Sequence, residues 1–112
     1  MHPLVMIDEQ DRVLWANTAF FAAFGVSAGQ TVGNLFHNLG SGQWAHPKLR
    51  EHIHDLFLSR PEFRDFLIEH DFESVGHRRM KVSGSRVQDP SAGARPVALL
   101  SIVDVSEGGP GR

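Results

Sequence analysis

Residues 4–25 constrain the fold of this chain more than any other stretch, because two strand patterns, a turn and a helix follow one another there. Leu4–Ile7 is a short apolar run rich in branched side chains, and Val13–Trp15 is a second apolar run. The polar residues Asp8–Asp11 between them are numerous enough to form a hairpin turn. The stretch therefore predicts a β-hairpin close to the N-terminus.

The helix that is expected next is marked at both of its ends. Asn17 offers a side-chain oxygen to the first free amides, which is the usual chemistry of a helix N-cap. Thr18–Phe24 repeats apolar residues at helical spacing, with Phe20 and Phe24 on one face. Gly25 can adopt the left-handed conformation that ends a helix. These signals predict a short helix over Thr18–Phe24.

The middle of the chain is predicted to be helical as well. One helical turn is expected near Ser27 and another over Leu35–Leu39. Pro47 favours the first turn of a helix. The apolar residues after it recur at spacings of three and four, which predicts an amphipathic helix over Pro47–Leu58 with its charged side in water.

The last part of the chain contains three strand patterns. Glu62–Phe72 alternates apolar and polar residues, and residues 74–77 are expected to form a turn before a strand over Arg78–Val87. A loop with two prolines then leads to Val97–Asp104, a nearly continuous apolar run typical of a central strand. Two strands, a helical middle and three strands predict an α+β fold: one five-stranded antiparallel sheet with short helices packed on one face.

The composition narrows the functional classes. The chain has 112 residues, enough for one domain with one core, and its formal net charge of -2 comes without any basic block. Nucleic-acid binding therefore has little support. No apolar run is long enough for a membrane span, and no signal peptide is visible, so a cytoplasmic location is expected. The absence of cysteine excludes disulfides and cysteine nucleophiles.

The order of residues in the first half resembles the opening of a PAS domain, the small sensor module of bacterial signalling proteins. The resemblance lies in Ile7-Asp8, Val13 to Asn17, Ala19-Phe20 and Phe24-Gly25. The ending Asp104-Val-Ser106 resembles the close of many PAS domains, where the last strand leads to an output domain. The segments 39–50, 66–72 and 76–80 are similar to PAS modules of sensor histidine kinases and chemotaxis methyltransferase fusions. The resemblance thus implies a PAS domain over residues 1–106, and residues 107–112 are expected to be a flexible tail toward a missing output domain.

The resemblance implies a non-catalytic sensory or dimerisation module that passes a ligand-dependent or partner-dependent change to an output domain, which is expected to be a histidine kinase. Two alternatives remain open. One is a purely structural homodimerisation module with a filled core. The other is a small-molecule enzyme on an α+β scaffold, whose turnover would depend on His70.

A ligand pocket is expected between the helices and the inner face of the sheet. Ligand pockets are concave and mostly apolar, with a few polar groups. His70 alternates with apolar residues on the inner face, so it is the polar side chain expected closest to a ligand. The candidate lining residues are Phe20, Phe24, Phe36, Phe57, Phe66, Ile68, His70, Met80, Val82, Leu100 and Ile102.

Cofactors are not expected, although two remain open. Haem-carrying PAS domains place a ligating histidine on the helix before the long strands, which points to His52 or His54 here. A metal site made by these two and His46 is weakly supported, because no acidic cluster completes it. Flavin can be held only without a cysteine adduct. We expect a colourless protein.

Two further groups of residues are expected to matter outside the pocket. Asp104 and Ser106 lie where the last strand leaves the sheet, and their side chains can fix the direction of the exit. Leu67, Leu99, Ser101 and Val103 fall on the outer face of the sheet. An apolar outer face normally needs a cover, so a homodimer through this face is expected.

Overall fold

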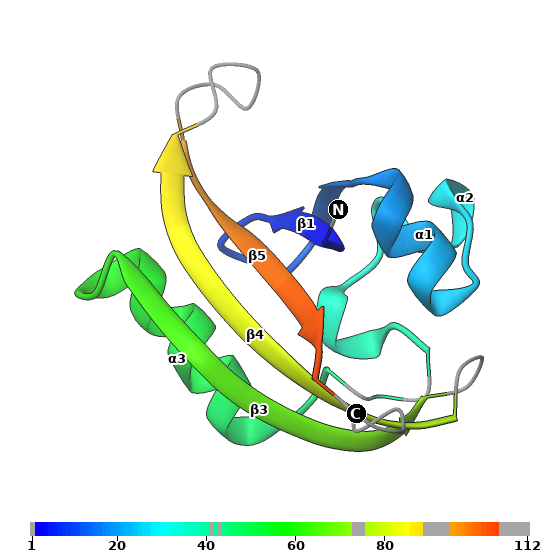
Figure 1. Cartoon of the computed structure of the whole chain (residues 1–112). Helices are drawn as coiled ribbons and strands as arrows, with labels where there is room; N and C mark the ends of the chain where they lie inside the picture. The colour runs from blue at the N-terminus through cyan, green and yellow to red at the C-terminus, as the bar shows by residue number, and fades with distance from the viewer. Residues whose placement is uncertain (1, 41, 43, 73–75, 89–94, 106–112) are drawn as a thin grey trace.

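The computed structural model describes residues 2–40, 42, 44–72, 76–88 and 95–105, and these form one antiparallel sheet with its helices on one side (Figure 1). The strands are β1 (Leu4–Ile7), β2 (Val13–Ala16), β3 (Glu62–Phe72), β4 (Gly76–Gln88) and β5 (Pro96–Asp104). The helices are α1 (Thr18–Phe24), α2 (Ala28–Thr31), the 3-10 turn η1 (Phe36–Asn38) and α3 (Pro47–Leu58). The predicted α+β fold class is confirmed.

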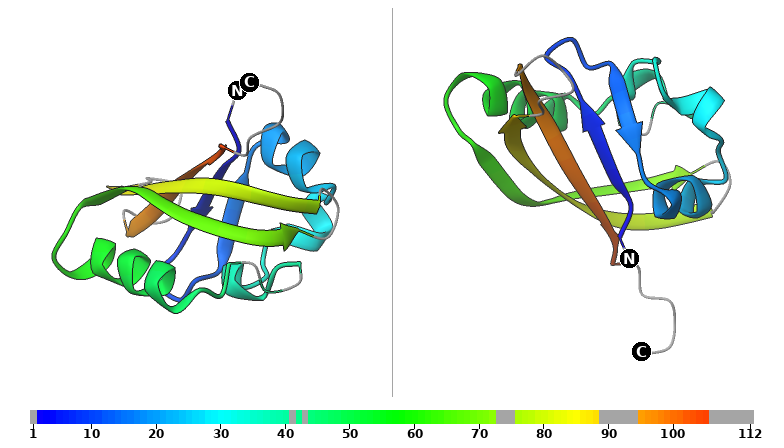
Figure 2. Two further views of the ribbon diagram at one scale, coloured as in Figure 1. Left: turned by 60° about the horizontal axis from the view of Figure 1, so that its bottom comes forward. Right: turned by 90° about the horizontal axis from the view of Figure 1, so that it is seen from above.

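The strand order β2-β1-β5-β4-β3 places the last strand at the centre of the sheet. β5 pairs with β1 on one side and with β4 on the other, so the N-terminal hairpin and the long β3–β4 hairpin meet on it. Figure 2 shows the long strands curling around the helices. This central position explains why the sequence of β5 is almost entirely apolar.

The sequence patterns gave the correct bounds for α1, α3 and β3, while the bounds of β2, β4 and β5 differ by one or two residues. The predicted turn over residues 74–77 is wrong at its end. β4 begins at Gly76, whose φ of 83° turns the chain back, and His77 already pairs with Asp71 across the hairpin. Residues 73–75 lie outside the described part of the chain.

A bulge interrupts the pairing of β3 with β4. The register shifts between Phe63 and Phe66, and Asp65 has a φ of 59°. The Asp65 amide donates to the Ser83 hydroxyl at 3.1 Å instead of to a backbone carbonyl. Such a bulge bends the strand, and the alternation beyond it still turns Ile68 inward.

The core lies between the inner face of the sheet and the helices. α3 contacts β3, β4 and β5, while α1 contacts β1 and α2 contacts β2. The sheet contributes a continuous layer of side chains that are at most 3% exposed: Val5, Ile7, Ile68, Met80, Val82, Leu100 and Ile102. The helical side contributes Phe20, Phe36, Leu49 and Leu56 to the same cluster.

Asn17 fastens the N-terminal strand to the first helix. Its Oδ1 accepts from the Phe20 amide at 3.0 Å and from the Leu4 amide at 2.9 Å, and its Nδ2 donates to the His2 carbonyl at 2.9 Å. The predicted N-cap is therefore correct, and Gly25 at the other end of α1 has the expected left-handed φ of 63°. Among the described residues, no helix is both long and apolar enough to cross a membrane.

Candidate functional site

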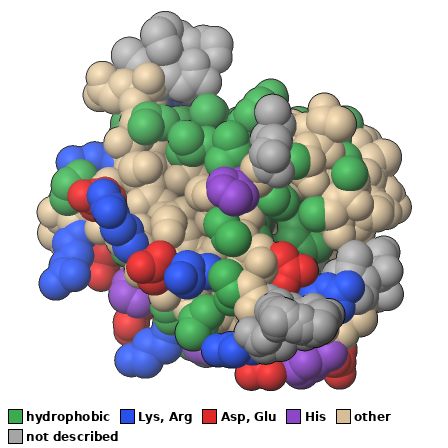
Figure 3. Space-filling view, viewed as in Figure 1, with side chains coloured by type: hydrophobic (Ala, Val, Ile, Leu, Met, Phe, Trp, Pro, Cys, Tyr) green, Lys and Arg blue, Asp and Glu red, His purple; other side chains and the backbone are tan. Residues whose placement is uncertain are grey.

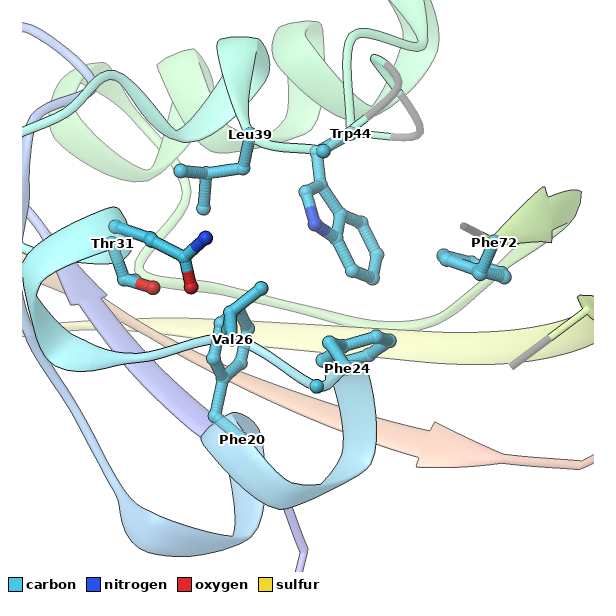
Figure 4. Close-up of a pocket in the computed structure, with 10 residues that line it drawn as sticks. Phe20, Phe24, Val26, Thr31, Leu39, Trp44 and Phe72 are labelled. Atoms are coloured by element: carbon cyan, nitrogen blue, oxygen red, sulfur yellow. The ribbon is translucent and has the colours of Figure 1, made fainter. Parts of the chain in front are cut away.

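A pocket of about 360 Å³ opens at one end of the core, between α1, α2, the segment that holds Trp44 and the end of β3 (Figure 4). Its volume lies at the low end of the range for small-molecule sites, about 300–1,000 Å³. The lining residues carry no charge: Phe20, Phe24, Gly25, Val26, Gln30, Thr31, Leu39, Gly40, Trp44 and Phe72.

Four of the ten lining residues are aromatic: Phe20, Phe24, Trp44 and Phe72. The rings of Phe24, Trp44 and Phe72 contact one another pairwise, with centroids 5.4 Å apart for Phe24–Trp44, 5.5 Å for Trp44–Phe72 and 5.7 Å for Phe24–Phe72. Phe36 stacks on the far side of Trp44 at 5.3 Å, with the two rings inclined by 16°. These contacts join four separate segments of the chain.

The cap of α2 supplies the polar side of the pocket. Ser27 and Gln30 form a capping box, in which the Ser27 amide donates to Gln30 Oε1 at 2.8 Å. The Thr31 hydroxyl donates to the Ser27 carbonyl at 2.8 Å and is 1% exposed. The oxygens of Gln30 and Thr31 are thereby held in place by local hydrogen bonds.

Two of the predicted pocket residues, Phe20 and Phe24, line this pocket. Six others belong to the packed core beside it: Phe36, Ile68, Met80, Val82, Leu100 and Ile102. Sequence reasoning did not include Trp44 or Phe72 among the lining residues. Phe72 shares the inner face of its strand with Ile68, and Trp44 is a large apolar side chain in a glycine-flanked segment, so both signals were present.

The remaining three predicted pocket residues lie elsewhere. Phe66 packs against His46 and His52 beside α3, with ring centroids 5.3 and 5.2 Å away. Phe57 lines a second, more open cavity of about 520 Å³ between the β1–β2 turn and α3. His70 is half-buried and sets its ring against the edge of Phe72 at 5.6 Å, so it touches a wall residue without lining the pocket.

The histidines considered for haem or metal have other surroundings. His46 accepts from the Lys48 amide at 3.2 Å and so caps α3, while His52 stacks on Phe63 at 5.3 Å. His54 is exposed and lines the second cavity. Since the aromatic pocket has no histidine among its lining residues, it does not fit a histidine-ligated haem. Within the described residues, no group of three potential ligands is placed to hold a metal ion.

The end of β5 is tied to β4. Asp104 Oδ2 lies 3.3 Å from Arg78 Nε, and the Val105 amide donates to the Arg79 carbonyl at 2.8 Å. The side chain of Asp104 thus pairs with a side chain of β4, and its role in fixing the direction of the exit stays a prediction. Ser106 and the expected tail over residues 107–112 lie outside the described part of the chain.

The outer face of the sheet carries an apolar surface, which we call the outer patch. Figure 3 shows hydrophobic side chains gathered toward the centre and top of this face, with charged ones along its left and lower margins. Leu67 is 48% exposed and Trp15 is 45% exposed. The outer patch consists of the half-buried or exposed residues Leu4, Met6, Trp15, Leu67, Leu99, Ser101 and Val103, and Lys81 of β4 lies between Leu67 and Val103.

A charge cluster closes the β3–β4 hairpin on the outer face. His77 Nε2 lies 2.8 Å from Glu69 Oε2, and His77 Nδ1 lies 2.7 Å from Asp71 Oδ1. The hydrogen bonds from Glu69 and then Asp71 raise the pKa of His77 above its ordinary value. Because sequence reasoning placed His77 in a turn, it missed this cluster.

The raised pKa of His77 predicts a stability that depends on pH. Its protonated form is favoured in the folded state, so its contribution is complete below the unfolded pKa of about 6.5 and is lost as pH rises through the folded value. Urea midpoints measured from about pH 6 to pH 8 should fall more steeply for the wild type than for His77→Gln. His54→Gln changes another exposed histidine and should follow the wild type. Parallel curves for all three proteins would contradict the role of His77.

Comparison with known proteins identifies the family. A family model described as the PAS fold matches residues 1–108, and the chain therefore belongs to the PAS family. No curated protein matches it. The PAS domain of a Desulfitobacterium hafniense protein is 14% identical with a TM-score of 0.68, covering 93% of this chain and 92% of that one.

Two further solved structures share the fold. The Rhodobacter sphaeroides LOV protein is 19% identical with a TM-score of 0.73, and the match covers 96% of this chain and 61% of that one. VqmA of Vibrio cholerae, described as a dimer, is 12% identical with a TM-score of 0.77 over 95% of this chain and 47% of that one. Another VqmA structure is described as bound to DPO. This chain thus spans 61% of the LOV protein and about half of VqmA.

Proposed function

We propose that this PAS domain is the non-catalytic sensory module of a bacterial signal-transduction protein, and that it binds a small molecule in the aromatic pocket. The observation that carries the proposal is the pocket of about 360 Å³, whose wall includes Phe72 at the end of β3. The sequence resemblance favours a sensor histidine kinase as the parent protein.

The contacts suggest how binding reaches an output domain. Phe72 follows Asp71, which pairs with His77, and His77 is followed on β4 by Arg78, the partner of Asp104. A ligand that moves Phe72 shifts the end of the β3–β4 hairpin, to which the end of β5 is bonded. A signal of this kind requires two arrangements that the ligand binds with different affinity.

Relatives with the same fold support a ligand-binding role and leave its chemistry open. A LOV protein and a VqmA structure with bound DPO are among the structural matches. A flavin bound in this chain would form no cysteine adduct, because the sequence has no cysteine. The competing function is structural dimerisation with the pocket unused.

A pocket-filling substitution tests the sensory proposal. Val26→Phe adds a ring at the pocket wall, whereas Val32→Phe adds the same ring at a position that is 43% exposed and outside the pocket. A screen of uncharged metabolites by thermal shift should find compounds that stabilise the wild type and Val32→Phe. The same compounds should lose at least about tenfold in affinity for Val26→Phe. Compounds that bind all three proteins equally, or no stabilising compound at all, would favour structural dimerisation.

We also propose that the outer patch joins two copies of the domain. Leu99 lies near the middle of this face, opposite Met6 on β1 and Ser85 on β4. Leu99→Glu places a charge in the proposed interface, so sedimentation equilibrium should show a monomer where the wild type is a dimer. Leu58→Glu changes a residue on α3 that is 66% exposed, and it should leave the dimer intact. A wild type that stays monomeric at high concentration would rule out this interface.

A further inference from the structure

The indole nitrogen of Trp44 is a hydrogen-bond donor that opens on the aromatic pocket. Trp44 is 1% exposed, and none of the hydrogen bonds among the described residues involves its Nε1. No sealed side-chain nitrogen or oxygen in the described residues lacks a partner, so Nε1 is open to the pocket and not enclosed in protein. Figure 4 shows this nitrogen on the side of the ring toward Leu39 and Thr31, while the six-membered ring faces Phe72.

Because the indole nitrogen is open to the pocket, water can occupy its donor position when no ligand is bound. The indole of Trp44 is a donor only and has no acceptor capacity. A ligand that offers an acceptor at this point therefore recovers a hydrogen bond that the protein alone does not form.

Thr31 provides the opposite chemistry across the pocket. Its hydroxyl hydrogen is committed to the Ser27 carbonyl at 2.8 Å, so only its oxygen lone pairs remain for a ligand. The pocket lining thus includes a donor at Trp44 and an acceptor at Thr31. A ligand with an acceptor and a neighbouring N–H or O–H matches both groups.

The rest of the lining restricts charge and shape. None of the ten lining residues is charged, so an ion would be desolvated there without a counterion. Three mutually contacting rings offer flat faces and edges, which suit an aromatic ligand in offset or edge-to-face contact. The volume of about 360 Å³ restricts the ligand to a small one.

We propose that the pocket takes an uncharged aromatic molecule of one or two rings with a lactam-like acceptor and donor pair, which receives the Trp44 indole N–H and donates to the Thr31 hydroxyl oxygen. This inference rests on the proposed sensory function and specifies the class of its ligand. The features that support it are the orientation of Trp44 and the committed hydroxyl hydrogen of Thr31.

Three probes of matched shape test the ligand class: 2-quinolone, which has a lactam; naphthalene, which has no polar group; and 2-naphthoate, which is charged. Titrations followed by ¹H–¹⁵N spectra separate the indole signal of Trp44 from that of Trp15, which lies on the outer patch. 2-Quinolone should shift the Trp44 signal, leave Trp15 in place and bind about fivefold more tightly than naphthalene. 2-Naphthoate should bind most weakly.

Trp44→Phe keeps a ring in the wall and removes the donor. It should bring the affinity for 2-quinolone down to that for naphthalene. Trp15→Phe should leave the difference in affinity between the two compounds unchanged. Equal binding of 2-quinolone and naphthalene to the wild type, or tightest binding of 2-naphthoate, overturns the ligand class even if Trp44→Phe fails to fold.

The same spectra separate this inference from the sensory proposal. The amides of Arg79 and Val105 report on the end of β5, since they belong to the contact that holds it. Preferential binding of 2-quinolone with no change at these amides supports the ligand class and contradicts the sensory function. Changes at these amides on binding of naphthalene and 2-quinolone with equal affinity support the sensory function and contradict the ligand class.

Discussion

Asn17→Ala is expected to lower the free energy of unfolding by about 3 kcal/mol. Asn17 is 9% exposed, and its side chain serves the Leu4 and Phe20 amides and the His2 carbonyl together. The alanine variant removes the side-chain partner of the Leu4 amide and of the His2 carbonyl, and it leaves the Phe20 amide only the Asn17 backbone carbonyl at 3.0 Å. Two of these bonds tie Leu4 of β1 and His2, two residues before the strand, to the start of α1, so the loss combines a helix cap with the attachment of a strand.

The free energies of unfolding of two further variants, measured in urea, separate the helix cap from the attachment of the strand. Asn17→Asp keeps the acceptor for the Leu4 and Phe20 amides and removes the donor to His2. Its free energy of unfolding should therefore fall by less than that of the alanine variant. Ser27→Ala removes the exposed N-cap of α2 and should cost about 1 kcal/mol. If Asn17→Ala lowers the free energy of unfolding by no more than Ser27→Ala does, the attachment of the strand contributes nothing to stability.

Gly84→Ala is expected to lower the free energy of unfolding by about 2 kcal/mol through overpacking. A Cβ at Gly84 would lie 2.6 Å from Phe63 Cε2, 2.9 Å from Leu100 Cδ2 and 3.1 Å from Leu56 Cδ1. Phe63 is half-buried and can move outward, but Leu100 and Leu56 are fully buried between the sheet and α3. The methyl group therefore pushes β4 away from α3.

Gly29→Ala is the matched control for Gly84→Ala. The nearest neighbour of a Cβ at Gly29 is Ser27 Oγ at 3.9 Å, and the position is an exposed one in α2. Alanine should be neutral or stabilise the fold by about 0.5–1 kcal/mol there. Equal unfolding curves for the two variants would contradict overpacking, because they would mean that α3 and β4 move apart without a loss of stability.

Elements whose signals are local could be predicted from the sequence. Asn17 and Gly25 mark the ends of α1. The apolar periodicity of Pro47–Leu58 and of Glu62–Phe72 lies within each element and shows which of its residues face the core. The family resemblance also follows from this local order. The predicted end of the β3–β4 turn was wrong. The turn ends where His77 pairs with Asp71 across the hairpin, and no local sequence pattern contains this pairing.

The position of the pocket depends on tertiary packing, so the sequence predicted its aromatic character better than its place. The inner face of the sheet is covered by Leu49 and Leu56 of α3, which pack into the same core cluster and leave the space at the other end. There Val26 and Trp44 come from irregular segments whose course has no periodicity. A periodic pattern identifies the core-facing side of a helix or strand. The course of the irregular segments determines which part of that side remains uncovered and forms the pocket.

Hydrogen exchange at the Val105 amide is the most direct test of coupling between the pocket and the end of β5. This amide donates to the Arg79 carbonyl, and Val26→Phe occupies the pocket permanently without any need to know the ligand. A coupled sensor predicts an exchange rate at Val105 that differs by at least about fivefold between Val26→Phe and the wild type. An exchange rate in Val26→Phe equal to that in the wild type and in Val32→Phe would contradict a sensor that works through this strand end.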